Sequence, residues 1–424
     1  MSTLEEPDSC GFAQPVSRLA AYMQTAQPLH CAAMTSEIRV QCYPPIWQAP
    51  IVPKRMLSLK NLIDSRIRPD VRAMHAYAIQ DSAGMVKLDA MENPHRLPPA
   101  LQQALGQRLG ALALNRYPGA RMNDLRQALA GYAAMPAGFD LMLGNGSDEL
   151  ISLLALACAV PPGSADSGKK ASVLAPVPGF VMYAMSAQLQ GLDFHGVALT
   201  EDFELDEAAM LAAIKEYQPA ITYLAYPNNP TANLWNDAVI ESVIEAAGAQ
   251  GGLVVIDEAY QPFASKSYID RLARHDHVLL LRTLSKFGLA GIRLGYLMGR
   301  SALIAEIDKV RPPYNVSVLN CECALFALEH QDVFATQALD LRVQRALLFD
   351  ELAKLPQVHA YPSEANMLLL RVPDAQKTFE GMRLRKVLVK NVANMHPLLL
   401  NCLRLTVGTA AENQQMLAAL RNCL

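Results

Sequence analysis

The chain has 424 residues, of which 51% are hydrophobic and 18% are charged, and its formal net charge is -3. This balance is typical of a folded protein, and it gives no electrostatic support for a nucleic-acid partner. The longest apolar runs fall short of the roughly 18 residues that a membrane span needs, so no membrane partner is predicted either.

The cysteines and the N-terminus indicate where the protein works. The chain contains eight cysteines but no CxxC pair, and the only close spacing, Cys321 and Cys323, is poor for zinc. Free thiols in a reducing cytoplasm are therefore predicted, with no metal site. The acidic start "MSTLEEPDSCGF" lacks the basic and apolar segments of a secretory signal, which also favours the cytoplasm.

The first part of the chain contains a segment without periodicity and then a helical region. Residues 1–56 are rich in Pro, Gln, Ala and Ser without periodicity, and they predict a poorly ordered N-terminal extension. Because a more regular stretch opens at Met56, the true start of the protein could also lie there. From about 99 to 160 apolar residues recur at intervals of three and four, which predicts a mostly helical region.

Short apolar runs then alternate with helical segments. The runs occupy residues 171–175, 193–199, 220–225, 252–256 and 277–281. Strands that alternate with helices indicate βαβ units and a largely parallel sheet. A long helical region follows from about 301 to 354, and the C-terminal part returns to strands and helices. We therefore expect a large α/β domain and a smaller α+β domain.

Polar and aromatic side chains follow four of the predicted strands. Phe180 follows the first run, Asn229 the third, Asp257 and Tyr260 the fourth, and Lys286 the fifth. Ligands of parallel sheets bind beyond the carboxyl ends of the strands, so these residues are candidates for one site. Each alone has an ordinary alternative, such as a helix cap, a turn, a core aromatic or a surface lysine.

A glycine-rich loop, "GNGSDEL" at 144–150, precedes an apolar helical pattern. Backbone N–H groups of Gly146 and Ser147 at a helix N-terminus could bind a phosphate, although an N-capped turn containing Asp148 is the simpler alternative. Ser285 and Arg293 flank Lys286 and could add a hydroxyl and a guanidinium group to the same phosphate. A ring, a phosphate, a reactive lysine and an aspartate together describe pyridoxal 5'-phosphate.

With these residues in place, the sequence resembles the fold-type-I aminotransferases that depend on pyridoxal phosphate, and most closely the histidinol-phosphate aminotransferases. The resemblance spans residues 57–424. The motifs that carry it are "KLDAMENP" (87–94), "NRYPGA" (115–120), "GNGSDELI" (144–151), "PGFVMY" (178–183), "PNNPT" (227–231), "VVIDEAY" (254–260), "RTLSKFGLAGIRLGY" (282–296), "SEANM" (363–367) and "CLRLTVGT" (402–409).

The resemblance implies a large domain with a mainly parallel seven-stranded sheet flanked by helices, plus a smaller α+β domain. The implied division is a poorly ordered extension (1–56), an N-terminal arm with part of the small domain (57–105), a large cofactor-binding domain (106–325) and a C-terminal small domain (326–424). It also implies a homodimer with shared active sites, in which Tyr117 reaches the cofactor phosphate of the neighbouring subunit.

The resemblance also implies roles around the cofactor. Lys286 would form the Schiff base and then carry the proton between substrate and cofactor. Asp257 would face the pyridine nitrogen, Asn229 and Tyr260 would hydrogen-bond the phenolic oxygen of the ring, and Phe180 would stack on it in place of the usual tyrosine. The residues implied to form the phosphate cup are Gly146, Ser147, Asp148, Ser285 and Arg293.

Four residues are implied to bind substrate: Tyr77, Asn93, Lys390 and Arg404. Arg404 matches the arginine that pairs with the α-carboxylate of glutamate. Tyr77 and Lys390 match positions near the substrate phosphate, where many members have arginine in place of Lys390. The alternatives are that Tyr77 packs in the interior and that Lys390 is a solvated charge at a strand end.

The sequence departs from the usual pattern in two further places. The insertion after the lysine is shortened to "SKFGLAGIR", and "PNNPTA" replaces the commoner "PNNPTG". Neither change removes a catalytic group. Both leave the loop geometry and the substrate preference open.

The activity implied is transamination of L-histidinol phosphate with 2-oxoglutarate, which yields imidazole-acetol phosphate and L-glutamate by a ping-pong mechanism. Two alternatives share the cofactor: a broad aromatic amino acid aminotransferase and a decarboxylase of a phosphorylated amino acid. A non-catalytic regulator that binds pyridoxal phosphate is a further alternative. It would need a DNA-binding helix-turn-helix, which the N-terminal extension does not supply.

Overall fold

The computed structural model describes residues 58–75, 80–160 and 170–424. The predicted extension, residues 1–56, and the alternative start at Met56 lie outside the described residues. The chain divides into two compact units, residues 1–74 and 75–424. In the first unit the described helices are α1 (Leu59–Arg66) and α2 (Pro69–Arg72). Ser58 caps α1 by accepting a hydrogen bond from the backbone N–H of Asn61.

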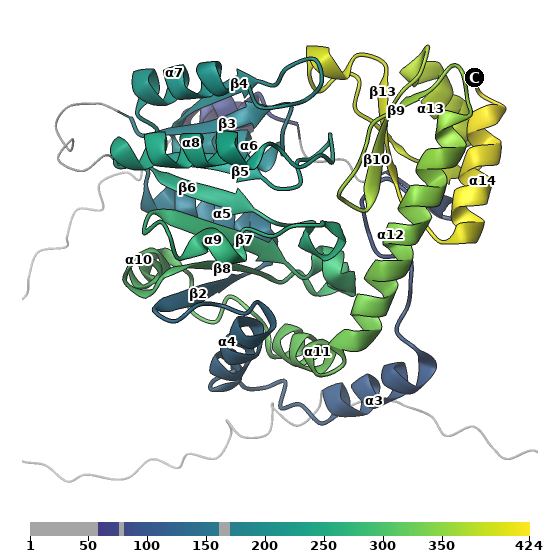
Figure 1. The fold of residues 1–424 in the computed structure, drawn as a ribbon. Coiled ribbons are helices and arrows are strands. Elements are labelled where there is room, and N and C mark those ends of the chain that lie inside the picture. Colours follow the sequence, from purple (N-terminus) through teal and green to yellow (C-terminus); the bar gives the residue numbers. More distant parts are fainter. Residues whose placement is uncertain (1–57, 76–79, 161–169) are drawn as a thin grey trace, which may run out of the picture. The chain divides into compact units, whose positions relative to one another are not determined.

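A seven-stranded sheet forms the centre of the second unit (Figure 1). Its strand order is β2-β8-β7-β6-β5-β3-β4, and only β8 runs antiparallel to its neighbours. The predicted fold, with a mainly parallel seven-stranded sheet, is confirmed. The strands are β2 (Phe139–Gly144), β3 (Ser172–Val177), β4 (Asp193–Ala198), β5 (Ile221–Ala225), β6 (Leu253–Asp257), β7 (Val278–Thr283) and β8 (Gly295–Arg300).

All five apolar runs are strands, as the sequence predicts, but the region 99–160 is less uniformly helical than expected. It contains the edge strand β2, whose residues "FDLMLG" lie between two helical patterns. A six-residue apolar run cannot be distinguished from part of a buried helix by periodicity alone. The long helical region from 301 is also interrupted, since residues 311–317 are not helical.

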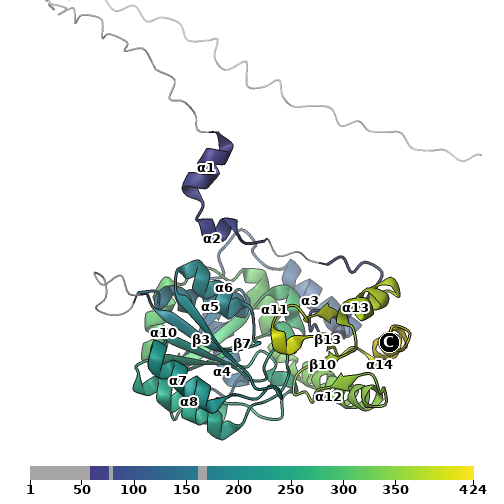
Figure 2. The same ribbon diagram turned by 90° about the horizontal axis from the view of Figure 1, so that it is seen from above.

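Successive residues of the central strands point to opposite faces of the sheet, as strand geometry requires. On β6, Val254 and Ile256 enter one hydrophobic cluster and Val255 enters another. Helices therefore cover both faces (Figure 2). One face packs against α4 (Arg121–Tyr132), α7 (Glu207–Tyr217), α8 (Asp237–Ala249), α9 (Ile269–Leu272) and α11 (Val318–Glu329), and the other against α5 (Gly146–Ala157), α6 (Met182–Gln190) and α10 (Ser301–Ile307).

A second, smaller core lies in the C-terminal part of the chain. Its antiparallel sheet has the order β12-β13-β10-β9, and β1 near the start of the unit pairs in parallel with β11. The elements are β1 (Val86–Lys87), β9 (His359–Ala360), β10 (Met367–Arg371), β11 (Val387–Leu388), β12 (Lys390–Asn391), β13 (Cys402–Thr406), α13 (Ala375–Leu384) and α14 (Ala410–Arg421). The boundaries at residues 105 and 325 stay predictions.

The long helix α12 (Gln331–Ala353) joins the two cores (Figure 1). Its Phe334 packs in the core of the large sheet, whereas Leu348 and Leu352 pack in the smaller core. The remaining elements are α3 (Pro99–Gly110) and the short helices η1 (Gln261–Phe263), η2 (Ser285–Leu289), η3 (Ala290–Ile292), η4 (Asp308–Val310) and η5 (Pro397–Leu399). Within the described residues, no helix is both long and apolar enough to cross a membrane.

The start of β8 approaches the turn before α5 so closely that only glycine fits. A Cβ atom on Gly295 would lie 2.7 Å from the carbonyl carbon of Gly146 and 2.8 Å from the backbone nitrogen of Ser147. We expect Gly295→Ala to lower the free energy of unfolding by roughly 1–3 kcal/mol, because backbone must move to admit the methyl group. Urea unfolding measures the change.

The matched control is Gly106→Ala on α3, where a Cβ atom would meet nothing within 4 Å. Alanine inside an exposed helix should raise the free energy of unfolding by roughly 0.5–1 kcal/mol. If Gly295→Ala proves as stable as the original protein, the close approach of β8 to α5 is not a constraint on the fold.

Candidate active site

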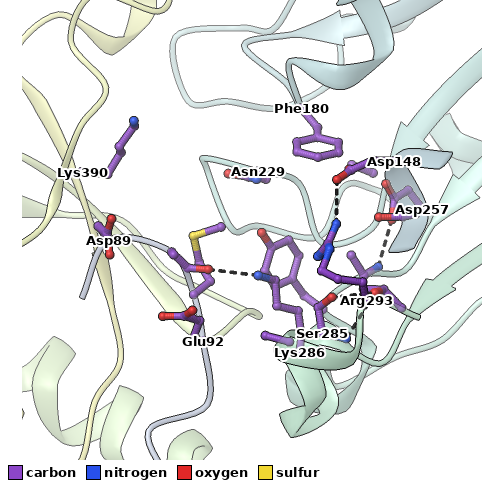
Figure 3. Close-up of a pocket in the computed structure, with 18 of the residues that line it drawn as sticks. Asp89, Glu92, Asp148, Phe180, Asn229, Asp257, Ser285, Lys286, Arg293 and Lys390 are labelled. Carbon is purple, nitrogen blue, oxygen red and sulfur yellow. Dashed lines mark hydrogen bonds and ion pairs between the residues drawn. The ribbon is translucent and has the colours of Figure 1, made fainter. Parts of the chain in front are cut away.

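A cavity of about 670 Å³ opens at the carboxyl ends of the parallel strands (Figure 3). Its wall combines residues of the large sheet with Lys390 of the smaller sheet, with Lys87 and with residues 89–92. Lys390 lies on the opposite side of the cavity from Asp257 (Figure 3). The predicted site residues that line it are Ser147, Asp148, Phe180, Asn229, Asp257, Tyr260, Ser285, Lys286, Arg293 and Lys390.

Lys286 follows β7 and extends its amine into this cavity. Its Nζ atom donates a hydrogen bond to the carbonyl oxygen of Ala90 at 3.0 Å and lies 5.9 Å from the ring centroid of Tyr260. Burial, assisted by the positive charge of Arg404, lowers the pKa of Lys286 to about 8. A substantial fraction of this amine is therefore neutral in mildly alkaline solution, as a nucleophile or base requires.

Asp257 ends β6 and is only 4% exposed. Its Oδ1 atom accepts a hydrogen bond from the backbone N–H of Ala259 at 3.0 Å, and its Oδ2 atom accepts one from the hydroxyl of Tyr183 at 2.7 Å. Burial raises the pKa of Asp257 to about 6, although both hydrogen bonds oppose the rise. The carboxylate is thus suited to a cationic partner inside the cavity.

The glycine-rich turn forms an anion cradle together with Arg293. Gly146 has φ of 75°, and a Cβ atom there would lie 2.7 Å from Nη2 of Arg293. The same Nη2 atom is 3.0 Å from Oδ2 of Asp148 in the first turn of α5. Ser147 and the buried Ser285 add hydroxyl groups to this side of the cavity. Backbone N–H groups, two hydroxyls and a guanidinium group are the donors that a phosphate needs.

The turn before α5 is braced from a distant loop. Asn145 donates from its backbone N–H to Oε2 of Glu149 at 2.7 Å, and Asn315 donates from Nδ2 to the same oxygen at 2.7 Å. In return, Nδ2 of Asn145 donates to the carbonyl oxygen of Asn315 at 2.5 Å. These bonds satisfy polar groups at the helix start and hold the cradle in one conformation.

Arg404 lies behind the wall of the cavity and connects it to the smaller sheet. Its Nη1 atom donates to Oδ1 of Asn229 at 2.7 Å, and its Nη2 atom donates to the carbonyl oxygen of Asp89 at 2.9 Å. Arg404 pairs across the strands with Lys390, so both cations belong to neighbouring positions on β12 and β13. Because Oδ1 of Asn229 is engaged, its Nδ2 group is the one that can donate into the cavity.

Four of the predicted residues that the structure describes do not line the cavity. Gly146 and Arg404 adjoin residues that do, whereas Tyr117 and Asn93 lie apart from it. Tyr117 is 75% exposed and stacks on Tyr314, with ring centroids 4.3 Å apart. Asn93 donates to Oε1 of Gln337 on α12 at 3.0 Å, which directs its side chain to the helix instead. Tyr77 lies outside the described residues, and its role stays a prediction.

Among the lining residues that the sequence did not single out, four are charged or aromatic. Lys87 forms ion pairs with Asp89, at 3.1 Å, and with Glu92. Tyr183 contacts Asp257, as described above. The motif "KLDAMENP" contained the first three, but it drew attention only to Asn93. Tyr183 lies three residues after Phe180, so it could have been found as the next side chain on the same face of a helix start.

The known proteins that this chain resembles are aminotransferases. The model of the family "Aminotransferase class I and II" matches residues 83–420. The chain belongs to this aminotransferase family. It is 75% identical over 358 residues to a protein of Polaromonas naphthalenivorans (strain CJ2) named histidinol-phosphate aminotransferase, covering 84% of this chain and 96% of that one. The protein of the same name from Methylibium petroleiphilum is 70% identical, covering 84% of this chain and 94% of that one.

Solved structures of aminotransferases share the fold. The histidinol-phosphate aminotransferase of Sinorhizobium meliloti in complex with pyridoxal-5'-phosphate superposes with a TM-score of 0.71 at 24% identity, covering 85% of this chain and 97% of that one. The histidinol-phosphate aminotransferase of Clostridium acetobutylicum gives the same TM-score at 20% identity, covering 79% of this chain and 98% of that one. The sequence resemblance to these enzymes is therefore confirmed at the level of fold and family.

This aminotransferase uses pyridoxal phosphate, and the residues present fit that cofactor. The cradle formed by Gly146 and Arg293 suits the phosphate, the buried carboxylate of Asp257 suits a protonated ring nitrogen, and the amine of Lys286 suits the aldehyde. Among the described residues, no group of three or more His, Cys, Asp or Glu side chains could hold a metal ion.

The lowered pKa of Lys286 has a kinetic consequence. Only the neutral amine attacks an aldehyde, and this amine loses its proton as the pH rises through about 8. Cofactor-free protein should therefore take up pyridoxal phosphate at a rate that rises with pH and levels off above that value. Stopped-flow absorbance measures the rate.

The control is the reaction of pyridoxal phosphate with Nα-acetyllysine, whose amine has an ordinary pKa of about 10.4. Its rate should continue to rise between pH 9 and 10. A protein rate that follows the control over this range would show that burial does not lower the pKa of Lys286.

Proposed function

We propose that this aminotransferase transfers the amino group of L-histidinol phosphate to 2-oxoglutarate, which gives imidazole-acetol phosphate and L-glutamate in histidine biosynthesis. The observation that carries the proposal is the placement of Lys286 and Lys390 in one cavity, a reactive amine and a distant cation. The 75% identity to the histidinol-phosphate aminotransferase of Polaromonas naphthalenivorans supports the same substrate.

The two half-reactions follow a ping-pong order in which Lys286 moves the proton. When bound, pyridoxal phosphate supplies an aldehyde that exchanges amines and a ring that delocalises the electron pair released from the substrate carbon. The Nζ atom of Lys286, once neutral, would take the proton from that carbon and pass it to the cofactor. The carbonyl oxygen of Ala90 at 3.0 Å orients the amine in the meantime.

The other catalytic residues hold the cofactor in its reactive form. Asp257 keeps the ring nitrogen protonated through its buried negative charge. Asn229, whose oxygen is engaged by Arg404, would donate from its amide nitrogen to the phenolic oxygen of the ring, and the hydroxyl of Tyr260 would donate to the same oxygen. Phe180, which lines the cavity, would stack on the ring and exclude water from one face.

The anion cradle holds the cofactor phosphate. Backbone N–H groups of Gly146 and Ser147 would bind it at the start of α5, where the helix dipole is favourable. Arg293 contributes a guanidinium group, positioned by Asp148 at 3.0 Å, and Ser285 contributes a hydroxyl. These groups would anchor the cofactor through its phosphate.

Two cations bind different anionic groups of the two substrates. Arg404 has the planar fork that pairs with the α-carboxylate of glutamate. Lys390 offers a point charge at the far side of the cavity and binds the phosphate of histidinol phosphate. Tyr77 is assigned to the same substrate phosphate and Asn93 to substrate binding, and both roles rest on the sequence alone.

We also propose that the enzyme is a cytoplasmic homodimer with shared active sites. The support is Tyr117, which is largely exposed, stacks on Tyr314 and lies apart from the cavity of its own chain. An exposed aromatic pair of this kind is enriched where two proteins meet. In the dimer, Tyr117 contributes its hydroxyl to the phosphate cradle of the neighbouring subunit.

The substrate is tested by a single turnover. The purified enzyme is mixed separately with histidinol phosphate, glutamate and phenylalanine, and conversion of the cofactor to its amine form is followed by absorbance. Rapid conversion by the first two and slow conversion by phenylalanine are expected. Conversion by phenylalanine without conversion by histidinol phosphate would instead establish a broad aromatic aminotransferase.

The role of Lys390 is tested by Lys390→Met, which removes the charge and keeps the length of the side chain. The half-saturating concentration of histidinol phosphate should rise about tenfold or more, since a hydrogen bond to a charged group contributes roughly 1.5–3 kcal/mol. Glutamate, the internal control, should react as before. An equal loss for both substrates would show that Lys390 does not select the phosphate.

Shared active sites are tested by complementation of two inactive variants. Tyr117→Ala and Lys286→Ala are unfolded together and refolded as a mixture. Random pairing makes half of the dimers heterodimers of the two variants. Each heterodimer holds one intact site and one defective site, so about a quarter of the native activity is expected. Activity no greater than the sum of the two separate variants would contradict a site that spans two subunits.

A further inference from the structure

Tyr183 lines the cavity next to Asp257, and the proposed mechanism does not use it. Its hydroxyl donates to Oδ2 of Asp257 at 2.7 Å. In the described part of the chain, Tyr183 is the one side chain that hydrogen-bonds this carboxylate. The other oxygen, Oδ1, accepts from the backbone N–H of Ala259 at 3.0 Å. Both oxygens of Asp257 are thus held by donors from different elements.

The ring of Tyr183 is fixed on two sides. It stacks on Tyr223 of β5 with ring centroids 4.2 Å apart and an interplanar angle of 7°. Its edge meets Phe180 at 5.6 Å and 86°. Because the side chain is 3% exposed and so enclosed, the direction of its O–H group is set by the protein before any ligand binds.

The charges around Asp257 make this single donor important. Burial disfavours its charged form, and the negative charges of Asp148 on α5 and of Glu258, just after β6, disfavour it further. The hydrogen bonds from Tyr183 and Ala259 act in the opposite direction. The remaining titratable groups that face this region are Tyr223, Tyr260 and Lys286.

We propose that Tyr183 is a positioning residue for the cofactor: its hydroxyl holds the carboxylate of Asp257 charged and directed at the ring nitrogen of pyridoxal phosphate. The inference rests on the role of Asp257 in the proposed function. Without the donor, one carboxylate oxygen remains buried and unpaired, and the carboxyl group takes up a proton more readily. A neutral carboxyl group no longer stabilises a protonated ring nitrogen.

Tyr223 provides a matched control. Like Tyr183 it is a buried tyrosine of the same stacked pair, at 1% exposure. Among the contacts of the described residues, however, its hydroxyl has no hydrogen-bond partner. Phenylalanine at either position removes one oxygen atom and keeps the ring, so the two variants share the packing change and differ in the bond to Asp257.

The experiment compares Tyr183→Phe, Tyr223→Phe, Asp257→Asn and the double variant Tyr183→Phe/Asp257→Asn. Binding of pyridoxal phosphate to the cofactor-free protein is titrated by fluorescence, and the absorption band of the bound cofactor is followed against pH. Tyr183→Phe should weaken binding about tenfold or more, as expected for a hydrogen bond to a charged group. The absorption band of the cofactor bound to Tyr183→Phe should also titrate at higher pH than in the original protein. Tyr223→Phe should bind pyridoxal phosphate with an affinity within about twofold of the original protein.

Three results would contradict the proposal. Equal binding and titration by Tyr183→Phe and Tyr223→Phe would show that the hydroxyl of Tyr183 has no role of its own. A loss caused by Tyr183→Phe that persists in the Asp257→Asn background would show that the effect does not pass through the carboxylate. Unchanged cofactor binding and titration in Asp257→Asn would show that Asp257 itself has no role. That result would contradict the proposed function, whereas the first two results contradict only the role of Tyr183.

Discussion

Burial of an amine and a carboxylate in one cavity is the constraint on which the site depends. Asp257 ends β6 and Lys286 follows the neighbouring strand β7. The loss of solvation that raises the pKa of Asp257 to about 6 also lowers that of Lys286 to about 8. One physical cause therefore brings a base and an anion into the pH range where both can act. A ligand with a cationic nitrogen and an aldehyde can pair with the carboxylate and react with the amine.

A buried ion pair next to the site holds these strand ends together. Glu258, next to Asp257, accepts a hydrogen bond from Nε of Arg282 on β7 at 2.9 Å, and Arg282 also donates to Oγ of Ser267 at 3.0 Å. Both side chains of the pair are almost fully buried. Such a pair costs desolvation free energy but tolerates little movement, so it fixes the ends of β6 and β7 relative to each other. The distance between Asp257 and Lys286 is set by this framework.

The sequence predicted the parts of the site that strand ends determine. Phe180, Asn229, Asp257 and Lys286 each follow an apolar run, and a parallel sheet brings such positions to one edge. Other parts depend on contacts that no local pattern encodes. Tyr183 hydrogen-bonds a residue 74 positions away, and the edge strand β2 is an apolar run between helices. The two-residue strand β1, which carries Lys87 to the cavity, is too short to show any periodicity.

The most direct measurement is the protonation state of the ring nitrogen, because the proposed role of the buried carboxylate of Asp257 is to keep that nitrogen protonated. The enzyme is loaded with pyridoxal phosphate labelled with ¹⁵N in the ring, and the ¹⁵N chemical shift is measured at neutral pH. The shift of a protonated pyridinium is expected, together with its loss in Asp257→Asn. The shift of a neutral pyridine in the original protein would contradict the role of Asp257 and the electrostatic basis of the site.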